Sequence, residues 1–372
     1  MTSRWVPLAT GFRPFFLLAA VWAVCAPLWW VGVLTGQAPH LAALPPLSWH
    51  VHEMLFGFTG AVVAGFLLTA VQNWTGQTTA TGGWLGGLTA LWVIARLQSF
   101  VDLGWAGTAI DVAFFPALAL AIGRPLWATG NRRNALFPFL LLILGGTDLA
   151  LHLGAEPRWL GGVAVDAVTV MVVLVGGRVI PMFTRNALKV QPTSYPWLER
   201  ASVGSVLVLL GWDLLSLPGI AAVLSLACLL QLARLAGWRG EHTLKTPILW
   251  VLHLGYLWMA LALGVRAAAE LGGLPLSVAT HLLTVGGIGT ITLGMMSRVA
   301  LGHTGRKLVV PGVLAAAFVA VSIATVLRAA WSVHPHPELL WASAVAFAAA
   351  FAVYVVRYAG ILTRPRADGK PG

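Results

Sequence analysis

The chain has 372 residues, of which 58% are hydrophobic and only 9% are charged. A soluble domain carries roughly 25% charged residues, so this composition excludes a water-soluble globular protein and indicates a helical or barrel protein of the membrane. The net charge of +11 would suit nucleic-acid binding, but the basic residues lie mainly in the connections between apolar runs. We attribute them to membrane topology and expect no nucleic-acid partner.

The apolar runs are long and continuous, which predicts an all-α, polytopic protein with about twelve transmembrane helices. These are predicted to begin near Phe15, Val51, Gly83, Trp105, Ala135, Trp159, Ala201, Pro218, Thr246, Leu276, Val310 and Leu339. Basic residues gather at the N-terminus, in every second connection and in the C-terminal tail, so the positive-inside rule places both termini in the cytoplasm. We expect one transmembrane domain over residues 1–372, divisible into two six-helix halves, 1–184 and 201–362, joined by a basic cytoplasmic loop. No internal repeat is evident at the residue level.

The first stretch with reactive side chains is PPLSWHVHEMLFG, residues 45–57, at the predicted external end of the second span. Regular α-helical spacing places His50, Glu53 and Gly57 on one face and turns His52 about 200° away from it. Each histidine then serves a different site, or only one of them is functional. Glu53 lies about one turn inside the apolar zone. It is a proton carrier, a hydrogen-bonding partner of His50 or half of a buried salt bridge, and the sequence leaves all three open.

Two further features lie in the fifth and sixth predicted spans. Asp148 and His152 are one helical turn apart, which we interpret as an interfacial hydrogen bond, with the orientation of a metal ligand as the alternative. The stretch GGRVIPMFTRNAL, residues 176–188, carries Arg178 and Arg185. These arginines suit an anionic group on a cofactor or a lipid phosphate.

His253 lies in the ninth predicted span, ~12 Å beneath its cytoplasmic edge by the rise per residue of a helix. A polar side chain at this depth is costly in lipid, which predicts a role as a ligand or in proton transfer, with Tyr256 as its partner. A structural histidine is the alternative.

The stretch HLLTVGGIGTITLGMMSRVALGHTGR, residues 281–306, carries the longest set of polar side chains within one span. Helical periodicity places His281, Thr292, Met295 and His303 on one stripe. The rise per residue separates His281 from His303 by ~33 Å, about the thickness of the hydrocarbon layer, so these two histidines cannot bind the same metal.

The depth of each histidine limits the combinations that can form a metal site. His281 is predicted at the outer level together with His50 and His52, and we expect the metal site there. Met295 would favour Cu(I) as the bound metal. Glu53 and Thr292 are the candidates for proton delivery if the site turns over.

Four motifs together resemble the NnrS family: GFRPFFLLAA from Gly11, WHVHEMLFG from Trp49, GGRVIPMFT from Gly176 and the stretch 281–306. The resemblance implies a bacterial inner-membrane protein of about twelve spans that binds haem b and copper. It implies a role in nitric oxide metabolism or resistance to nitrosative stress, often alongside denitrification. By resemblance, the candidate metal ligands are His50, His52, His281 and His303, and the motif arginines are Arg13, Arg178, Arg298 and Arg306.

The expected function is therefore nitric oxide binding or redox turnover at a histidine-ligated metal site near the periplasmic side. Whether the protein is an enzyme, an oxidoreductase acting on nitric oxide, is left open. Its expected partners are nitric oxide, membrane lipid and a quinol or periplasmic electron donor. The alternatives are a copper or other metal transporter that uses the histidine and methionine stripe, and a haem-based sensor or assembly factor without catalysis.

Overall fold

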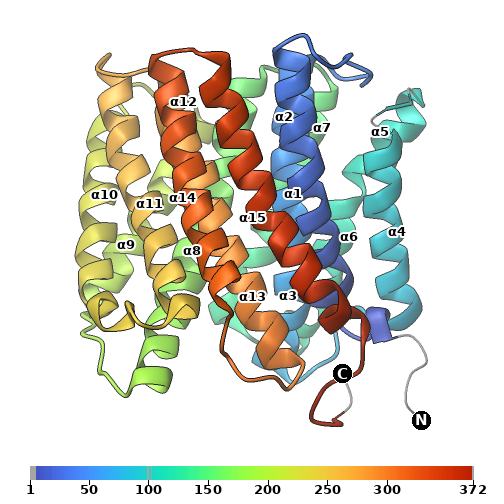
Figure 1. The fold of residues 1–372 in the computed structure, drawn as a ribbon, viewed down its shortest axis with the longest axis vertical. Helices are drawn as coiled ribbons and strands as arrows, with labels where there is room; N and C mark the ends of the chain where they lie inside the picture. The colour runs from blue at the N-terminus through green and yellow to red at the C-terminus, as the bar shows by residue number, and fades with distance from the viewer. Residues whose placement is uncertain (1–5, 99, 102, 371–372) are drawn as a thin grey trace. The chain divides into compact units, whose positions relative to one another are not determined.

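The computed structural model describes residues 6–98, 100–101 and 103–370, and regular structure within these ranges is helical, with no strand (Figure 1). The all-α prediction is confirmed for this part of the chain. In chain order the elements are η1 (Val6–Leu8), α1 (Phe12–Leu34), α2 (Pro46–His52), η2 (Glu53–Thr59), α3 (Gly60–Thr75), α4 (Gly82–Gln98), α5 (Gly104–Val112), α6 (Phe114–Ala128), η3 (Arg132–Asn134), α7 (Leu136–His152), α8 (Pro157–Leu188), α9 (Pro196–Leu214), α10 (Ala221–Ala236), η4 (Gly240–Thr243), α11 (Pro247–Glu270), α12 (Leu276–His281), η5 (Leu282–Gly289), α13 (Thr290–His303), α14 (Gly312–Val333) and α15 (Pro337–Thr363).

Nine helical stretches of the described chain are long and apolar enough to cross a membrane. They are α1, α2 to α3, α5 to α6, η3 to α7, α8, α11, α12 to α13, α14 and α15. Helices α4 and α10 are shorter, with 17 and 16 residues, and α9 includes Glu199, Arg200 and Asp213. The chain is therefore a multi-pass membrane protein. The count of twelve spans and the cytoplasmic location of both termini stay predictions.

Helix boundaries follow from proline and glycine. Pro46, Pro196 and Pro247 occupy the first helical turns of α2, α9 and α11, where the fixed φ of proline fits and its missing N–H costs no hydrogen bond. Helix α3 ends at Gly76, whose φ of 67° lies in the left-handed region that glycine adopts without strain.

Two spans contain a π-helical segment, which in each case follows a short first helix. Segment η2 begins directly after His52, and η5 begins directly after His281. Such wide turns are rare and are found mostly at functional sites. They also break the α-helical spacing, so the predicted shared face of His50, Glu53 and Gly57 is not maintained across η2.

The chain forms two compact units, each built from separate stretches of sequence. Unit 1 comprises Met1–Ala164, Met296–Leu308 and Phe351–Gly372, and unit 2 comprises Val165–Met295 and Val309–Ala350. Three of the boundaries fall inside α8, α13 and α15, and the fourth lies between α13 and α14. The division into sequential halves at 1–184 and 201–362 stays a prediction.

Aromatic side chains fill the core of unit 1. Phe56 packs edge-on against Phe115 with ring centroids 5.9 Å apart, and Phe58 packs against Phe351 at 5.2 Å. All four rings are buried, and they join η2 to α6 and to the C-terminal part of α15. Edge-to-face packing of this kind adds stabilisation beyond the buried area.

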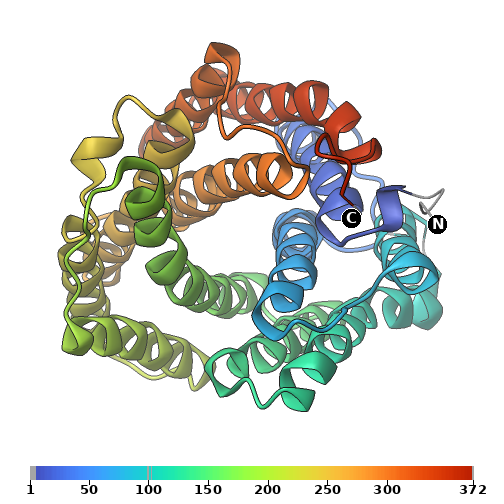
Figure 2. The same cartoon turned by 90° about the horizontal axis from the view of Figure 1, so that it is seen from below.

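The C-terminal tail of unit 1 is fixed against the start of α1 (Figure 2). The buried guanidinium of Arg13 donates hydrogen bonds of 2.9 Å to the backbone oxygens of Leu362 and Arg364. Arg13 is one of the motif arginines identified in the sequence. In the structure its guanidinium binds backbone oxygens at the end of α15.

Unit 2 contains a buried polar network centred on Arg234 of α10. Its guanidinium pairs with Glu199 of α9 and donates to the backbone oxygen of Val173 (2.9 Å) and to the hydroxyl of Tyr256 (3.2 Å). Gly177 leaves the space for this guanidinium, because a Cβ at Gly177 would lie 1.8 Å from Arg234 Nη2. The second glycine of the GGR motif is thereby explained by packing.

Candidate metal centre

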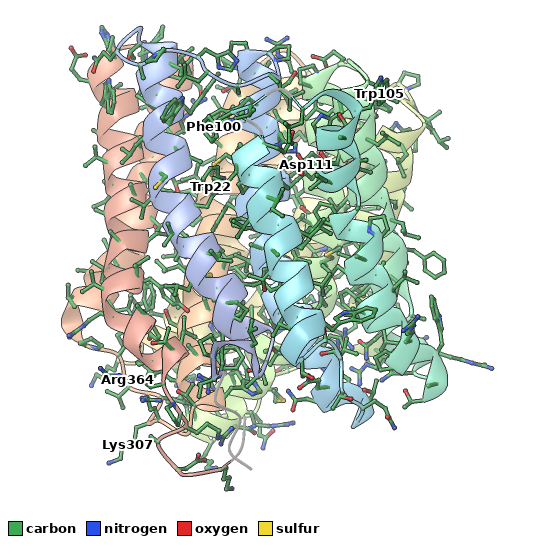
Figure 3. All side chains as sticks on the ribbon, turned by 90° about the vertical axis from the view of Figure 1, so that its right-hand side faces the viewer. Trp22, Phe100, Trp105, Asp111, Lys307 and Arg364 are labelled. Carbon is green, nitrogen blue, oxygen red and sulfur yellow. The ribbon has the colours of Figure 1, made fainter. Side chains whose placement is uncertain are left out.

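Several helix ends of unit 1 bring ionisable side chains together. His52 ends α2, Asp111 lies in the last turn of α5, and Asp148 and His152 lie in the last two turns of α7. Asp111 lies toward the same end of unit 1 as Trp105, opposite to Lys307 and Arg364 (Figure 3).

The imidazole of His52 is fully buried and faces carboxylates on both sides. Its Nδ1 lies 2.9 Å from Oε1 of Glu53, and its Nε2 lies 2.9 Å from Oδ2 of Asp111 and 3.2 Å from Oδ1 of Asp148. Glu53 is therefore the partner of His52. The proposed pairing of Glu53 with His50 is not found; instead, His50 stacks on Trp30 with ring centroids 4.5 Å apart.

Arg96 of α4 connects two of the carboxylates. Its Nη2 donates to Oδ1 of Asp111 at 2.7 Å, and its Nε lies 3.3 Å from Oε2 of Glu53. Gln98 of the same helix donates to Oδ2 of Asp111 at 3.1 Å. The end of α4 thereby fixes the orientation of both acids.

His152 completes the cluster. Its Nε2 lies 3.3 Å from Oδ2 of Asp111 and 3.9 Å from Oδ1 of Asp148. Its ring meets that of His52 edge-on, with centroids 5.3 Å apart. Asp148 and His152 thus approach each other as expected, but both side chains also face His52 and Asp111, which favours the alternative of a metal-site role.

Four of these residues have the chemistry and spacing of a metal site. One ligand atom from each of His52, Asp111, Asp148 and His152 lies within 4.8 Å of the others. Two ligands ~2.0–2.1 Å from one metal, at square or tetrahedral angles, lie ~2.9–3.4 Å apart. The separations of His52 Nε2 from the two aspartates fall in this range. Nitrogen and carboxylate ligands together suit Cu(II), Zn²⁺ or Fe(II).

The charges in the cluster favour a cation. Glu53, Asp111 and Asp148 provide three carboxylates, whereas Arg96 provides one fixed positive charge. Asp148 is fully buried, and neither of its carboxylate oxygens accepts a hydrogen bond of good geometry within the described chain. Excess negative charge in a buried site is costly unless protons or a metal ion compensate it.

A cavity of about 260 Å³ gives access to the cluster. His52, Asp111, His152 and Gln98 line it together with the exposed Trp105. A small ligand can therefore reach the imidazole and carboxylate groups from the surface of unit 1.

The cluster fits a metal ion and does not fit haem. The Nε2 atoms of His52 and His152 both lie within 3.3 Å of the same oxygen, Oδ2 of Asp111. A porphyrin between these imidazoles would displace that carboxylate.

The remaining predicted residues of unit 1 lie elsewhere in that unit. His303, at the end of α13, packs on the ring of Phe12 with centroids 5.7 Å apart. Arg298 is buried in α13, and Arg306 donates to the backbone oxygen of Thr304 at 3.3 Å. Their proposed cofactor roles stay predictions.

Unit 2 contains the other predicted site residues. His253 contacts the backbone oxygen of Leu249 through Nδ1 (3.1 Å) and the hydroxyl of Thr184 through Nε2 (3.4 Å). Its expected partner was Tyr256, which instead donates to Gln231. The roles proposed for this histidine and for the other four unit 2 residues stay predictions: Arg178, His281, Thr292 and Met295.

His281 bonds within its own helix. Its Nδ1 lies 2.7 Å from the backbone oxygen of Ser277. A metal site shared by His281 with His50 and His52 stays a prediction, because these residues belong to different units.

Sequence reasoning missed Asp111 and Arg96. The usable signal was an ionisable residue inside each of two apolar runs, WVIARL and AIDVAFF. Such residues are rare in spans unless they pair with one another. Arg96 and Asp111 meet because α4 and α5 both pack beside His52, and this packing cannot be read from the sequence.

The fold and this cluster define a class of protein: a multi-pass helical membrane protein with a buried histidine and carboxylate site suited to a metal ion. The sequence matches the family described as NnrS protein over residues 7–366, nearly the whole chain. The chain belongs to the NnrS family, as its motifs indicated. No curated protein matches it in sequence.

Proposed function

We propose that the protein binds a copper ion at His52, Asp111, Asp148 and His152 and uses this site to bind or turn over nitric oxide. The observation that carries the proposal is the position of His52 Nε2, 2.9 Å and 3.2 Å from two carboxylates. If Nδ1–H donates to Glu53, a neutral imidazole directs its Nε2 lone pair at both acids. A metal ion bound between them removes this repulsion.

Membership of the NnrS family supports the role in nitric oxide metabolism. The cavity supports it as well, because a diatomic gas needs only a narrow path to the metal. Nitrogen and oxygen ligands suit Cu(II), and neutral imidazole also suits Cu(I). Haem b, the second expected cofactor, would need a separate site, and its candidate ligands remain His50, His253, His281 and His303.

The proposed location of the site is the periplasmic side of the inner membrane. Lys307 and Arg364 lie at the end of unit 1 opposite to Asp111 (Figure 3). The positive-inside rule assigns the basic end to the cytoplasm, and the metal site then lies near the periplasm. A quinol or a periplasmic donor would supply electrons if the reaction is a redox reaction.

The experiment measures metal content and nitric oxide binding in protein purified from copper-replete cells. Metal analysis of the wild type is compared with Asp148→Asn and with His52→Ala, followed by absorption and electron paramagnetic resonance spectra with and without nitric oxide. We expect about one copper per chain in the wild type, loss of most of it in both variants, and a spectral change with nitric oxide only when copper is present.

The matched control is Asp166→Asn, because Asp166 is an equally buried carboxylate that pairs with Arg266 in unit 2. This variant should keep its copper. Wild-type protein without copper, or Asp148→Asn and His52→Ala variants with full copper content, would show that the cluster is not a copper site. Copper that moves across vesicles carrying the protein would favour the metal-transporter alternative.

A further inference from the structure

Two spans of the chain share a sequence pattern that runs from the proline at their start to the glycine that follows their end. An ungapped alignment of residues 46–76 with residues 275–305 places His281 on His52. The identical pairs are Pro46 and Pro275, Leu47 and Leu276, Ser48 and Ser277, His52 and His281, Gly57 and Gly286, Gly60 and Gly289, Gly65 and Gly294, Thr75 and Thr304, and Gly76 and Gly305.

The local structures agree along the same alignment. A short helix that begins at a proline step ends at the aligned histidine, and a π-helical segment follows directly in both spans. The glycines that follow the two spans, Gly76 and Gly305, have φ of 67° and 70°. Because π-helical segments are rare, their occurrence at the same aligned position is not expected by chance.

The aligned glycines Gly57 and Gly286 also have equivalent neighbours. A Cβ on Gly57 would lie 2.7 Å from Nη1 of Arg96 and 2.9 Å from the ring of Trp22. A Cβ on Gly286 would lie 2.8 Å from Cγ2 of Thr325 and 3.0 Å from the ring of Trp258. In each unit, the tryptophan beside the aligned glycine comes from the long helix before the span, α1 or α11. The second side chain comes from a helix after the span, α4 or α14.

The charged side chains of unit 1 are replaced in unit 2. Leu282 occupies the aligned position of Glu53, and Thr325 occupies the place of Arg96. His281 is surrounded by neutral polar groups: the backbone oxygen of Ser277, 2.7 Å from its Nδ1, and two hydroxyl groups. Its Nδ1 lies 3.4 Å from the hydroxyl of Ser277, which lies 3.0 Å from the hydroxyl of Ser332.

Arg328 of α14 adds a positive charge to this set. It donates to Ser332 at 2.7 Å, approaches the hydroxyl of Ser277 at 3.4 Å and stacks on Trp331 at 4.4 Å. No carboxylate of the described chain forms an ion pair with it. His281, Ser277, Ser332 and Arg328 are all half-buried, so a solute or a headgroup can reach them.

We infer that the two spans are copies of one motif and that the unit 2 copy is an anion-binding site formed by Arg328, Ser277, Ser332 and His281. A guanidinium held by hydroxyl groups and stacked on an indole presents its remaining donors to an oxyanion. The anion is a small free oxyanion or the phosphate of a phospholipid, which share this chemistry.

The test titrates nitrite and, separately, inorganic phosphate into the detergent-purified full chain by calorimetry, and measures retained phospholipid by native mass spectrometry. The variants are Arg328→Gln and Ser277→Ala. The matched control is Arg124→Gln, because Arg124 also lies over a tryptophan, Trp84, at 5.6 Å.

For a free oxyanion, we expect saturable binding that weakens about tenfold or more in Arg328→Gln, and by a smaller factor in Ser277→Ala. For a lipid phosphate, neither soluble anion binds the purified protein, and Arg328→Gln loses a phospholipid that the wild type and Arg124→Gln retain. The inference is overturned if the wild type binds neither anion and retains the same lipids as Arg328→Gln. Circular dichroism of each variant establishes that it is folded.

Discussion

His52 Nε2 lies 2.9 Å from Oδ2 of Asp111, although the two residues belong to helices separated in sequence by α3 and α4. The contact joins the end of α2 to the end of α5 in unit 1. It therefore ties the arrangement of these two helices to the occupancy of one small site, and variants of this cluster should affect both metal content and stability.

Glu53→Gln should weaken copper binding while leaving the four direct ligands in place. The carboxylate lies 2.9 Å from Nδ1 of His52, and a charged acceptor there raises the basicity of the other ring nitrogen. We expect affinity to fall by about 10- to 100-fold, measured by competition with a copper chelator. Glu156→Gln, at an exposed acid paired loosely with Arg158, is the control. Equal affinities for both variants would exclude an orienting role of Glu53.

Gly57→Ala should destabilise the protein. Its Cβ would lie 2.7 Å from Nη1 of Arg96 and 2.9 Å from Oε2 of Glu53, so one of these buried groups must move. Overpacking of this kind costs about 1–3 kcal/mol, which should lower the thermal unfolding midpoint in detergent. Gly146→Ala is the control, since nothing lies within 4 Å of its Cβ position. A midpoint for Gly57→Ala at or above that of Gly146→Ala would contradict the close packing of η2.

Gly177→Ala should disrupt the network of Arg234 in unit 2. The new Cβ would occupy the position of the guanidinium, and moving the guanidinium breaks its pairing with Glu199. Overpacking that forces a buried side chain to move typically costs about 1–3 kcal/mol and can cost more. We expect little folded protein by size-exclusion chromatography, whereas Gly204→Ala, in open space on α9, should yield the normal amount.

The anchoring of the C-terminal tail should be insensitive to pH near neutrality. Arg366 holds the pKa of Asp368 below its usual range by hydrogen bonding, and Arg366 also donates to the backbone oxygen of His303 at 2.8 Å. A lowered pKa in the folded state means that the contribution is present above the unfolded pKa and is lost only as pH falls through the folded value.

Amide exchange at Ala367, whose N–H donates to Thr304 at 2.9 Å, provides the measurement. We expect protection relative to the intrinsic exchange rate to stay constant from about pH 5 to pH 8. Asp368→Asn should lose protection throughout this range. A wild-type protection that falls at pH 5 would contradict the lowered pKa of Asp368, and an Asp368→Asn variant that keeps wild-type protection would show that Asp368 does not hold the tail.

The predicted topology can be tested by labelling single cysteines. Gln37→Cys and Lys307→Cys, both at exposed positions, are made after Cys25 and Cys228 are replaced by serine. We expect an impermeant maleimide to label Gln37→Cys in intact cells and Lys307→Cys only after lysis. Labelling of both positions from outside would refute the predicted arrangement of the spans.

The sequence was sufficient for the helical class because the apolar runs are long and uninterrupted, and for the family because its motifs are specific in combination. It also located Glu53 and His52 as reactive groups. It could not assign their partners, since the π-helical segment after His52 breaks the spacing from which faces were read. Asp111 escaped notice because a single acid has no local pattern.

The repeat proposed above is not evident from the sequence alone for a related reason. The residues shared by the two spans are mostly glycines and a PLS step within apolar sequence, which are common in membrane helices and carry little weight alone. The matching π-helical segments made them significant. For His253, residue spacing predicts a position along the helix but not a partner. Its contact with Thr184 depends on how α8 packs against α11.

The π-helical segment η2 has a mechanical consequence for the metal centre. If its hydrogen bonds shifted to the α-helical pattern over one turn, the end of α2 would rotate by roughly 100° relative to α3. His52 would then leave Asp111, while the glycines packed against α1 stayed in place. A metal ion bound by His52 together with residues of α5 and α7 would oppose this rotation, so metal binding would favour the π-helical form of the span.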